Sequence, residues 1–551
     1  MTKKPSIDLI ERYGAVFIAV LIVIVLIAQA RLLYIFPQPD SARWWGDETG
    51  QMLELRTELQ DGYARIPTAY GSSLAITNGF VRGNSWFAAA IYGVPALLFS
   101  NVADVVVIGR TITFVLSLGL ILLMYRMLRA SQVPRVLSLS ALLLLVSTRS
   151  FFFSSHAARL DVAAGIVVLA FVWYLSSRYD ALEQSRWRPT LLWYFGYGAA
   201  VVVFATLSIH LLTLLGALSL YTVWRFRAFH KLSFIGSAIG GVVVMLGLLI
   251  AIYSISGSPF SLYSPSSAPN QFQTVTAELP ILRPFSRSVQ VANIIERVHG
   301  LWVEAPAFLV FIFIAIPLSV LRRASAQKSN TGKWISGSAL VIAVAWLLFQ
   351  SPALYYYIQV LPLFIVWAVM DISKRWKSTL IVNSIVVSIC ILLCVFAVMD
   401  TVRAERTSRK IDRDNHTVIA EALDSVRSNT NSGAPPLVLA QNPAIAMLEH
   451  DKRVHLMSAH IVSFPTSSEP IASILLKLHV NYLLLYAAHG GLNYSADYHT
   501  LRPIADSIGA VILRKPGVLF DVDRDYFSAS ALRDESSRDT LILYKLPSIA
   551  H

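Results

Sequence analysis

Long apolar stretches separated by short polar loops fill the first 400 residues of the chain. A helix needs about 20 consecutive apolar residues to cross a bilayer, and the pattern predicts about eleven such helices. One of them contains Arg149, and two others require a tight turn at Ser208-Ile209. The predicted spans are 14–36, 105–125, 136–153, 162–177, 190–207, 210–224, 233–255, 304–321, 334–349, 355–371 and 378–399.

Positive charge alternates between the loops in step with these spans. Every second short loop is basic, and the loops between them are not. Because cytoplasmic loops carry an excess of Lys and Arg, this pattern predicts a cytoplasmic N-terminus and an extracytoplasmic C-terminal region. The first apolar run lacks a cleavage site for a signal peptidase, so it is expected to stay as a membrane anchor. The basic loops are 1–12, 126–135, 178–188, 225–231, 322–333 and 374–377.

The composition agrees with a membrane protein. Hydrophobic residues make up 55% of the chain and charged residues only 14%, whereas soluble domains average about 25% charged residues. The net charge of +13 is largely explained by the basic loops, so we expect no nucleic-acid partner. Both cysteines, Cys390 and Cys394, lie in one apolar run, which excludes a disulfide framework and a zinc motif.

Three longer segments are expected on the extracytoplasmic side. In the first of them, Met52, Leu55 and Leu59 follow helical spacing, and the apolar run 85–99 is short and interrupted by Pro95. Two short helices lying along the membrane surface would fit this pattern. The long middle segment, rich in Ser and Pro, is expected to order over a substrate as a lid. The three segments are 37–104, 256–303 and 400–551.

The C-terminal segment differs in character from the rest of the chain. Short apolar runs with β-propensity alternate with helical stretches, which favours a small α/β domain with a mostly parallel sheet. We therefore expect a transmembrane domain over 1–399 and an extracytoplasmic α/β domain over 400–551, acting as a cap or as a docking module for an acceptor. The candidate strands are 436–441, 453–457, 482–486 and 539–546.

Several motifs resemble the GT-C membrane glycosyltransferases, which include the protein O-mannosyltransferases and the aminoarabinose transferase of lipid A. "RWWGDETGQM" (43–52) places an Asp-Glu pair just after the first span, and "SSHAARLDVAAGIVVLAF" (154–171) resembles the family's Arg-x-Asp/Glu element. The stretches 105–129 and "SPALYYYIQVLPLFIVWAV" (351–369) resemble its second span and its late Tyr-rich span. One departure is "ATLSIHLLTLL", where many relatives carry a Lys-Gly pair and this chain has His210.

The resemblance implies a transfer reaction at the outer membrane surface. The donor would be a sugar on a polyprenyl monophosphate held in membrane lipid, and the acceptor a glycan, a glycolipid or a protein. Asp47 would act as the base that deprotonates the acceptor, and Glu48 would assist or orient it. The alternative is that both acids only stabilise the start of a helix through its dipole.

Other residues are candidates for binding the donor. Arg159 and Asp161 would serve as a phosphate contact and a second acid; alternatively, Arg159 reaches lipid head groups and Asp161 caps a helix. Trp44, Tyr356 and Tyr357 would contact the substrate or belong to an aromatic belt at the membrane surface. The remaining phosphate-binding candidates, each also compatible with a solvated loop, are His210, Arg283, Arg287, Arg297 and His299.

No complete set of metal ligands occurs within one segment. Acidic pairs are suitable ligands for Mg²⁺, but a monophosphate donor does not require a metal in this family, so we expect no cofactor. Two other function classes stay open. A transporter of lipid-linked sugars is disfavoured because no internal repeat is found, and a non-catalytic scaffold would use the C-terminal segment only for binding.

Overall fold

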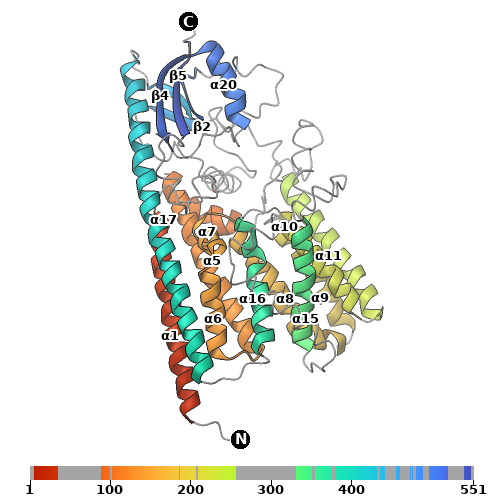
Figure 1. The fold of residues 1–551 in the computed structure, drawn as a ribbon. Helices are drawn as coiled ribbons and strands as arrows, with labels where there is room; N and C mark the ends of the chain where they lie inside the picture. Colours follow the sequence, from red (N-terminus) through yellow and green to blue (C-terminus); the bar gives the residue numbers. More distant parts are fainter. Residues whose placement is uncertain are drawn as a thin grey trace.

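The structure is a computed structural model of a helical bundle with a sheet at one end (Figure 1). Its helices and strands are described here for part of the chain. The described residues are 5–34, 52, 89–99, 102–184, 187–205, 209–226, 228–255, 330–349, 354–373, 380–430, 435–440, 454–458, 472, 475, 479–487, 496–518 and 539–547.

Helices coincide with every predicted span except 304–321, which lies outside the described residues. By length and composition, five of the described helices could cross a membrane, or six if one bent pair counts as a single span. The chain is therefore a multi-pass helical membrane protein. The helices are α1 (Pro5–Ala30), the 3₁₀ turn η1 (Arg31–Tyr34), α5 (Val102–Ala130), α6 (Arg135–Val146), α7 (Arg149–His156), α8 (Asp161–Gln184), α9 (Trp187–Ala205), α10 (Ile209–Arg225), α11 (Ala228–Ile255), α15 (Asn330–Phe349), η5 (Leu354–Gln359), α16 (Leu361–Ser373) and α17 (Leu380–Ser428).

The span predicted at 136–153 is two helices instead of one. The chain bends by 67° between α6 and α7. The new helix begins after Thr148, whose side chain accepts a hydrogen bond from the backbone N–H of Phe151. Such an N-cap satisfies one of the free N–H groups of a helix start, which lets the helix begin again beside Arg149.

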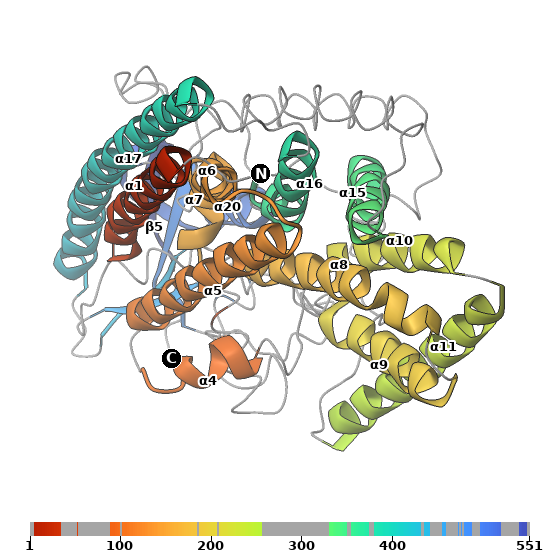
Figure 2. The ribbon, with the colours of Figure 1, turned by 90° about the horizontal axis from the view of Figure 1, so that it is seen from below.

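Helices α1, α6 and α17 form one side of the bundle, and α9, α10 and α11 lie at the other (Figure 2). A Cβ atom at Gly14 would lie 3.7 Å from Val136 of α6 and 3.8 Å from Val387 of α17, so the three helices pack closely here. Further along, Gln29 Nε2 donates to the backbone oxygen of Val146 at 3.0 Å. Because both contacts advance in the same direction, α1 and α6 run parallel and their N-terminal ends lie together.

Helix α17 continues far beyond its predicted end. It has 49 residues, which corresponds to about 70 Å of helix. The predicted domain boundary at 399/400 falls inside this continuous helix. Near that point Glu405 accepts hydrogen bonds from Arg31 at 3.0 Å and from Arg409 at 3.2 Å, and the first of these ties the start of η1 to α17.

The end of the bundle opposite the N-terminus carries a five-stranded sheet in the order β2-β1-β3-β5-β4 (Figure 1). The pairs β2-β1 and β1-β3 are parallel, whereas β3-β5 and β5-β4 are antiparallel. The expected mostly parallel sheet is therefore wrong for half of the pairs, because β5 runs opposite to both of its neighbours. The elements are β1 (Leu437–Ala440), β2 (His455–Ser458), β3 (Tyr482–Ala487), α20 (Ala496–Ile508), β4 (Ala510–Val518) and β5 (Asp539–Lys545).

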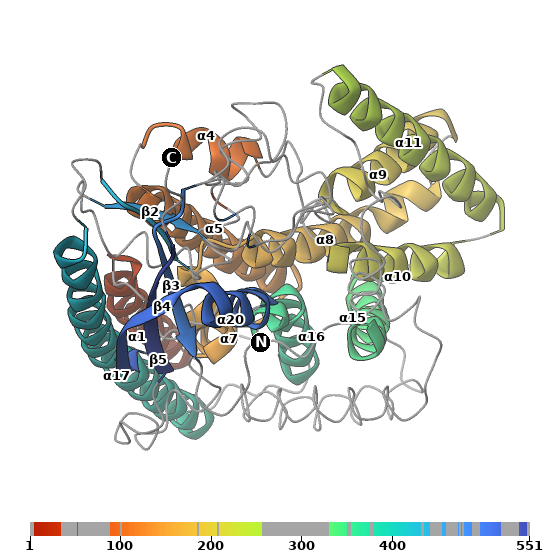
Figure 3. The same ribbon diagram turned by 90° about the horizontal axis from the view of Figure 1, so that it is seen from above.

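Both faces of this sheet are covered, as Figure 3 shows from above. Leu484 and neighbouring side chains pack with Leu423 and other residues of α17, while Leu483 packs with Leu501 of α20 on the other face. Burial of both faces explains why strands such as "YLLLYA" are apolar throughout instead of alternating. An ion pair of 2.8 Å between Lys515 and Glu421 adds a polar link between the sheet and α17.

Candidate functional site

The turn between α7 and α8 holds an ion pair in a largely buried setting. Arg159 Nε donates to Asp161 Oδ2 at 3.0 Å, and the two side chains are only 14% and 7% exposed. Gln359 Nε2 donates to the other oxygen, Asp161 Oδ1, at 3.2 Å. Asp161 is also the first residue of α8, where the helix dipole favours a negative charge. Its carboxylate therefore joins the turn, α8 and η5.

Gln359 reaches this turn because η5 packs closely on α8. A Cβ atom at Gly165 would lie 2.7 Å from the backbone oxygen of Ile358, which is too close for an ordinary contact. Tyr357 is buried against Trp346, with ring centroids 4.7 Å apart, whereas Tyr356 is partly exposed. The Tyr-rich stretch thus forms part of the wall beside Asp161.

A short helical stretch of the first long loop closes over the same turn. It consists of a π-helical turn, η3 (Ala89–Gly93), and α4 (Val94–Ala96), in the region where a short surface helix was predicted. Tyr92 is buried, contrary to a purely surface position; its hydroxyl donates to the backbone oxygen of Arg159 at 3.2 Å and lies 3.1 Å from Thr113 Oγ1. Burial raises the pKa of Tyr92, with a smaller contribution from Asp161, so this hydroxyl keeps its proton.

His156, at the end of α7, is a buried polar residue beside this turn. Its Nδ1 lies 2.6 Å from the backbone oxygen of Phe152, which can only accept, so Nδ1 carries the proton. The ring also packs against Phe114 at a centroid distance of 5.6 Å. Arg110 of α5 is fully buried and close enough to interact electrostatically with this imidazole.

Met52, in the first long loop, packs near the turn that holds Arg159. It is fully buried, and a Cβ at Gly109 would lie 2.5 Å from its sulfur and 2.8 Å from the Cβ of Ala158. Met52 thus packs on α5 at Gly109, the same residue that Ala158 of the Arg159 turn approaches. The glycine at 109 is required by this close approach.

The structure brings together only some of the predicted site residues. Arg159, Asp161, Tyr356 and Tyr357 lie in or beside the turn described above. His210 is the second residue of α10, and its side chain is not among those described. The candidates that lie outside the described residues are Trp44, Asp47, Glu48, Arg283, Arg287, Arg297 and His299.

Sequence reasoning missed three members of the cluster. His156 lies within the quoted motif "SSHAARLD", and its position among apolar residues was a usable signal. Tyr92 and Gln359 gave no such signal, because each forms its hydrogen bond to the turn with a residue far away in the sequence. In the described part of the chain, no group of three or more His, Cys, Asp or Glu residues is arranged to hold a metal ion.

Comparison with known proteins gave matches in structure only. No family model and no curated protein matches the sequence. ArnT from Cupriavidus metallidurans in the apo state matches with a TM-score of 0.51 and 12% identity, over 95% of this chain and 97% of that chain. The undecaprenyl phosphate-bound structure of ArnT matches over 96% and 98%, with 13% identity and a TM-score of 0.49. An oligosaccharyltransferase from Archaeoglobus fulgidus matches over 85% and 69%, with 12% identity and a TM-score of 0.43.

The match to apo ArnT extends over nearly the full length of both proteins. At 12% identity, what this match establishes is the fold. It agrees with the resemblance carried by the Arg-x-Asp motif and the late Tyr-rich span. The chain is therefore a multi-pass membrane protein with a GT-C-like fold.

Proposed function

We propose that the protein is a membrane glycosyltransferase that uses a polyprenyl-monophosphate sugar. It transfers the sugar to a glycan, glycolipid or protein on the extracytoplasmic face. The observation that carries the proposal is the buried Arg159–Asp161–Gln359 cluster in a GT-C-like bundle. Charged side chains at the end of a membrane helix are costly to bury, and a fixed guanidinium there suits a lipid phosphate.

Arg159 is the group that contacts the donor phosphate in this proposal. The hydrogen bond from its Nε to Asp161 fixes the plane of the guanidinium, whose geometry matches phosphate oxygens. Both oxygens of Asp161 already accept hydrogen bonds, one from Arg159 and one from Gln359. This favours a positioning role for Asp161 over direct contact with the sugar.

Asp47 is the proposed base, and Glu48 assists it. Met52 follows Asp47 by five residues in the sequence and packs beside Gly109 and the Arg159 turn, which supports an acid pair acting near this cluster. Asp47 takes the proton from the acceptor hydroxyl or amine. The acceptor atom then forms a bond to the anomeric carbon while the bond from that carbon to the phosphate oxygen breaks. The polyprenyl phosphate leaves with the electron pair, and the anomeric configuration inverts.

The remaining parts of the proposal concern substrate binding, metal requirement and location. His210, Arg283, Arg287 and His299 are further candidates for the developing phosphate charge, and Trp44, Tyr356 and Tyr357 for contact with the sugar or the lipid chain. The reaction needs no metal cofactor. The protein lies in the inner or plasma membrane with a cytoplasmic N-terminus, and its C-terminal sheet is a cap or an acceptor-docking module.

Deletion of the gene in the source organism tests this proposal. Mass spectrometry of envelope glycans and of lipid-linked sugars should show one missing sugar and one accumulating polyprenyl-phosphate sugar. Complementation with wild type should restore the product, whereas Asp47→Asn and Arg159→Gln should not. Asp400→Asn, which changes a partly exposed carboxylate on α17, should restore it and serves as the matched control. All variants are first shown to reach wild-type levels in the membrane.

The same experiment separates the other function classes. If Asp47→Asn restores the product, Asp47 is not the base and the mechanism is wrong. A protein that moves the lipid-linked sugar across the membrane without transferring the sugar would be a transporter. Unchanged glycans and unchanged lipid-linked sugars in the deletion strain would favour a non-catalytic scaffold.

A further inference from the structure

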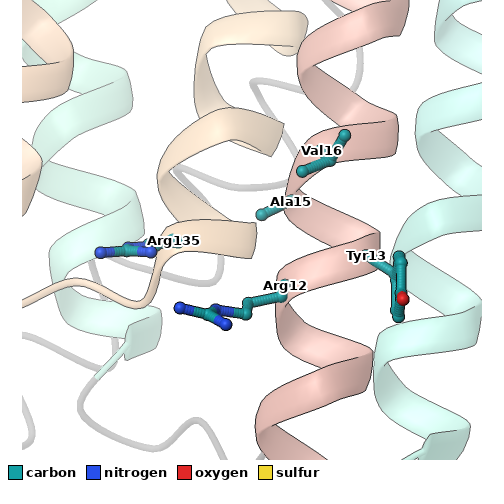
Figure 4. Close-up of a pocket in the computed structure, with 5 residues that line it drawn as sticks. All are labelled: Arg12, Tyr13, Ala15, Val16 and Arg135. Atoms are coloured by element: carbon teal, nitrogen blue, oxygen red, sulfur yellow. The ribbon is translucent and has the colours of Figure 1, made fainter.

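A hollow of about 390 Å³ lies between the N-terminal ends of α1 and α6. It is lined by Arg12, Tyr13, Ala15 and Val16 of α1 and by Arg135, the first residue of α6. Its volume is in the range of pockets that hold small ligands. Figure 4 shows both arginine side chains extending in the same direction, Arg135 from the start of α6 and Arg12 from within α1. The hollow lies at the end of the bundle opposite the candidate site, since α6 begins at Arg135 and α7 ends at His156.

The two arginines have the same charge and face one hollow. Both are exposed, and among the side chains that the structure describes from residue 11 onward, none forms a carboxylate ion pair with either arginine. Two positive charges that line one hollow favour an anion there, because it offsets their mutual repulsion. The N-cap of α6 is Pro134, which provides no side-chain cap, so the positive end of that helix adds to the field.

The position of the hollow relative to the membrane indicates that the anion belongs to a lipid. The first membrane-crossing segment begins at Glu11, and the second ends at Ala130, five residues before Arg135. Both arginines therefore lie at the level of the lipid head groups. Next to them, Val16, Val20 and Val23 form an outward apolar stripe on α1, with 63%, 50% and 52% of their surfaces exposed.

We propose that this hollow binds an anionic phospholipid of the leaflet on the N-terminal side. The phosphate of the lipid lies between the guanidinium groups of Arg12 and Arg135, which suit bidentate phosphate contacts. One acyl chain lies along the valine stripe of α1. Basic pockets between membrane helices are known to recognise anionic head groups in this way. The bound lipid offsets the repulsion between the two arginines where α1 packs on α6.

Native mass spectrometry of the full-length protein tests the proposal. The protein is purified in detergent and supplied with phosphatidylglycerol or with zwitterionic phosphatidylcholine. We expect wild type to retain phosphatidylglycerol in preference, and the double variant Arg12→Ala/Arg135→Ala to lose about tenfold of that preference. Arg178→Ala removes an exposed arginine in the C-terminal part of α8, outside the hollow, and should retain the lipid like wild type.

Two further measurements keep the test decisive. The unfolding temperature in detergent without lipid should be the same for wild type and the double variant. If the double variant unfolds at a lower temperature, Arg12→Lys/Arg135→Lys replaces it. That variant keeps both charges but loses the planar guanidinium groups. This variant should retain less phosphatidylglycerol than wild type. Equal retention of both lipids by wild type, or wild-type retention by the double variant, would overturn the proposal. Displacement of the lipid by millimolar inorganic phosphate would also overturn it, because the site would then bind a soluble anion.

Discussion

Replacement of Asp161 by Asn tests whether the buried carboxylate holds Arg159 in place. Asn has nearly the same shape and can still accept a hydrogen bond from Gln359, so the change removes mainly the charge-assisted bond to Arg159. Hydrogen bonds to charged groups contribute about 1.5–3 kcal/mol. Because the two side chains are only 14% and 7% exposed, solvent screens them little. We therefore expect Asp161→Asn to lower the free energy of unfolding by about 2 kcal/mol.

A double-mutant cycle separates this interaction from other effects. Equilibrium unfolding by SDS in mixed micelles is measured for wild type, Asp161→Asn, Arg159→Gln and the double variant. The coupling free energy should be about 2 kcal/mol. A coupling below about 0.5 kcal/mol would refute the reasoning, since it would mean that the pair contributes no more than an exposed one. Glu405→Gln is the matched control: its two partners, Arg31 and Arg409, have side chains 63% and 65% exposed, so the cost should be at most about 1 kcal/mol.

Three further outcomes follow from the packing and the proposed orientation. Gly165→Ala should destabilise the protein by about 1–3 kcal/mol, because the added Cβ meets a backbone carbonyl of η5. In Gly216→Ala of α10 the added Cβ meets nothing, so this control should be neutral or slightly stabilising. Thermal unfolding measures both variants, and equal effects would contradict the close packing of η5 on α8. Thr148→Ala removes the N-cap of α7 and should cost about 1 kcal/mol in the same assay; no change would show that the cap does not hold the bend. A membrane-impermeant maleimide should label Ser507→Cys in intact cells and Gln132→Cys, in the basic loop between α5 and α6, only after permeabilisation, since both positions are exposed and the native cysteines are buried. The reverse labelling would contradict the predicted orientation.

Local sequence patterns were sufficient to locate most of the helices and strands. A membrane span requires a continuous apolar run, and a strand buried on both faces requires one too, so both can be read from the sequence. The predicted run at 482–486 is β3, and the predicted span at 105–125 lies within α5. The Arg-x-Asp motif also identified the charged part of the site, because charge inside an apolar region is unusual and therefore visible.

The sequence alone determined where this chain is apolar, where four of its five described strands run, and that Arg159 and Asp161 lie at the end of a membrane helix; β4 was not predicted. Only the tertiary structure decided which groups surround that pair. Gln359 reaches Asp161 across 198 residues, and the 67° bend between α6 and α7 turns the short helix α7 away from the axis of α6. The continuation of α17 past residue 399 depends on its packing against the sheet, and the mixed sheet depends on β5 lying between β3 and β4. Periodicity records which face of one element is apolar, but it does not record which distant element covers that face.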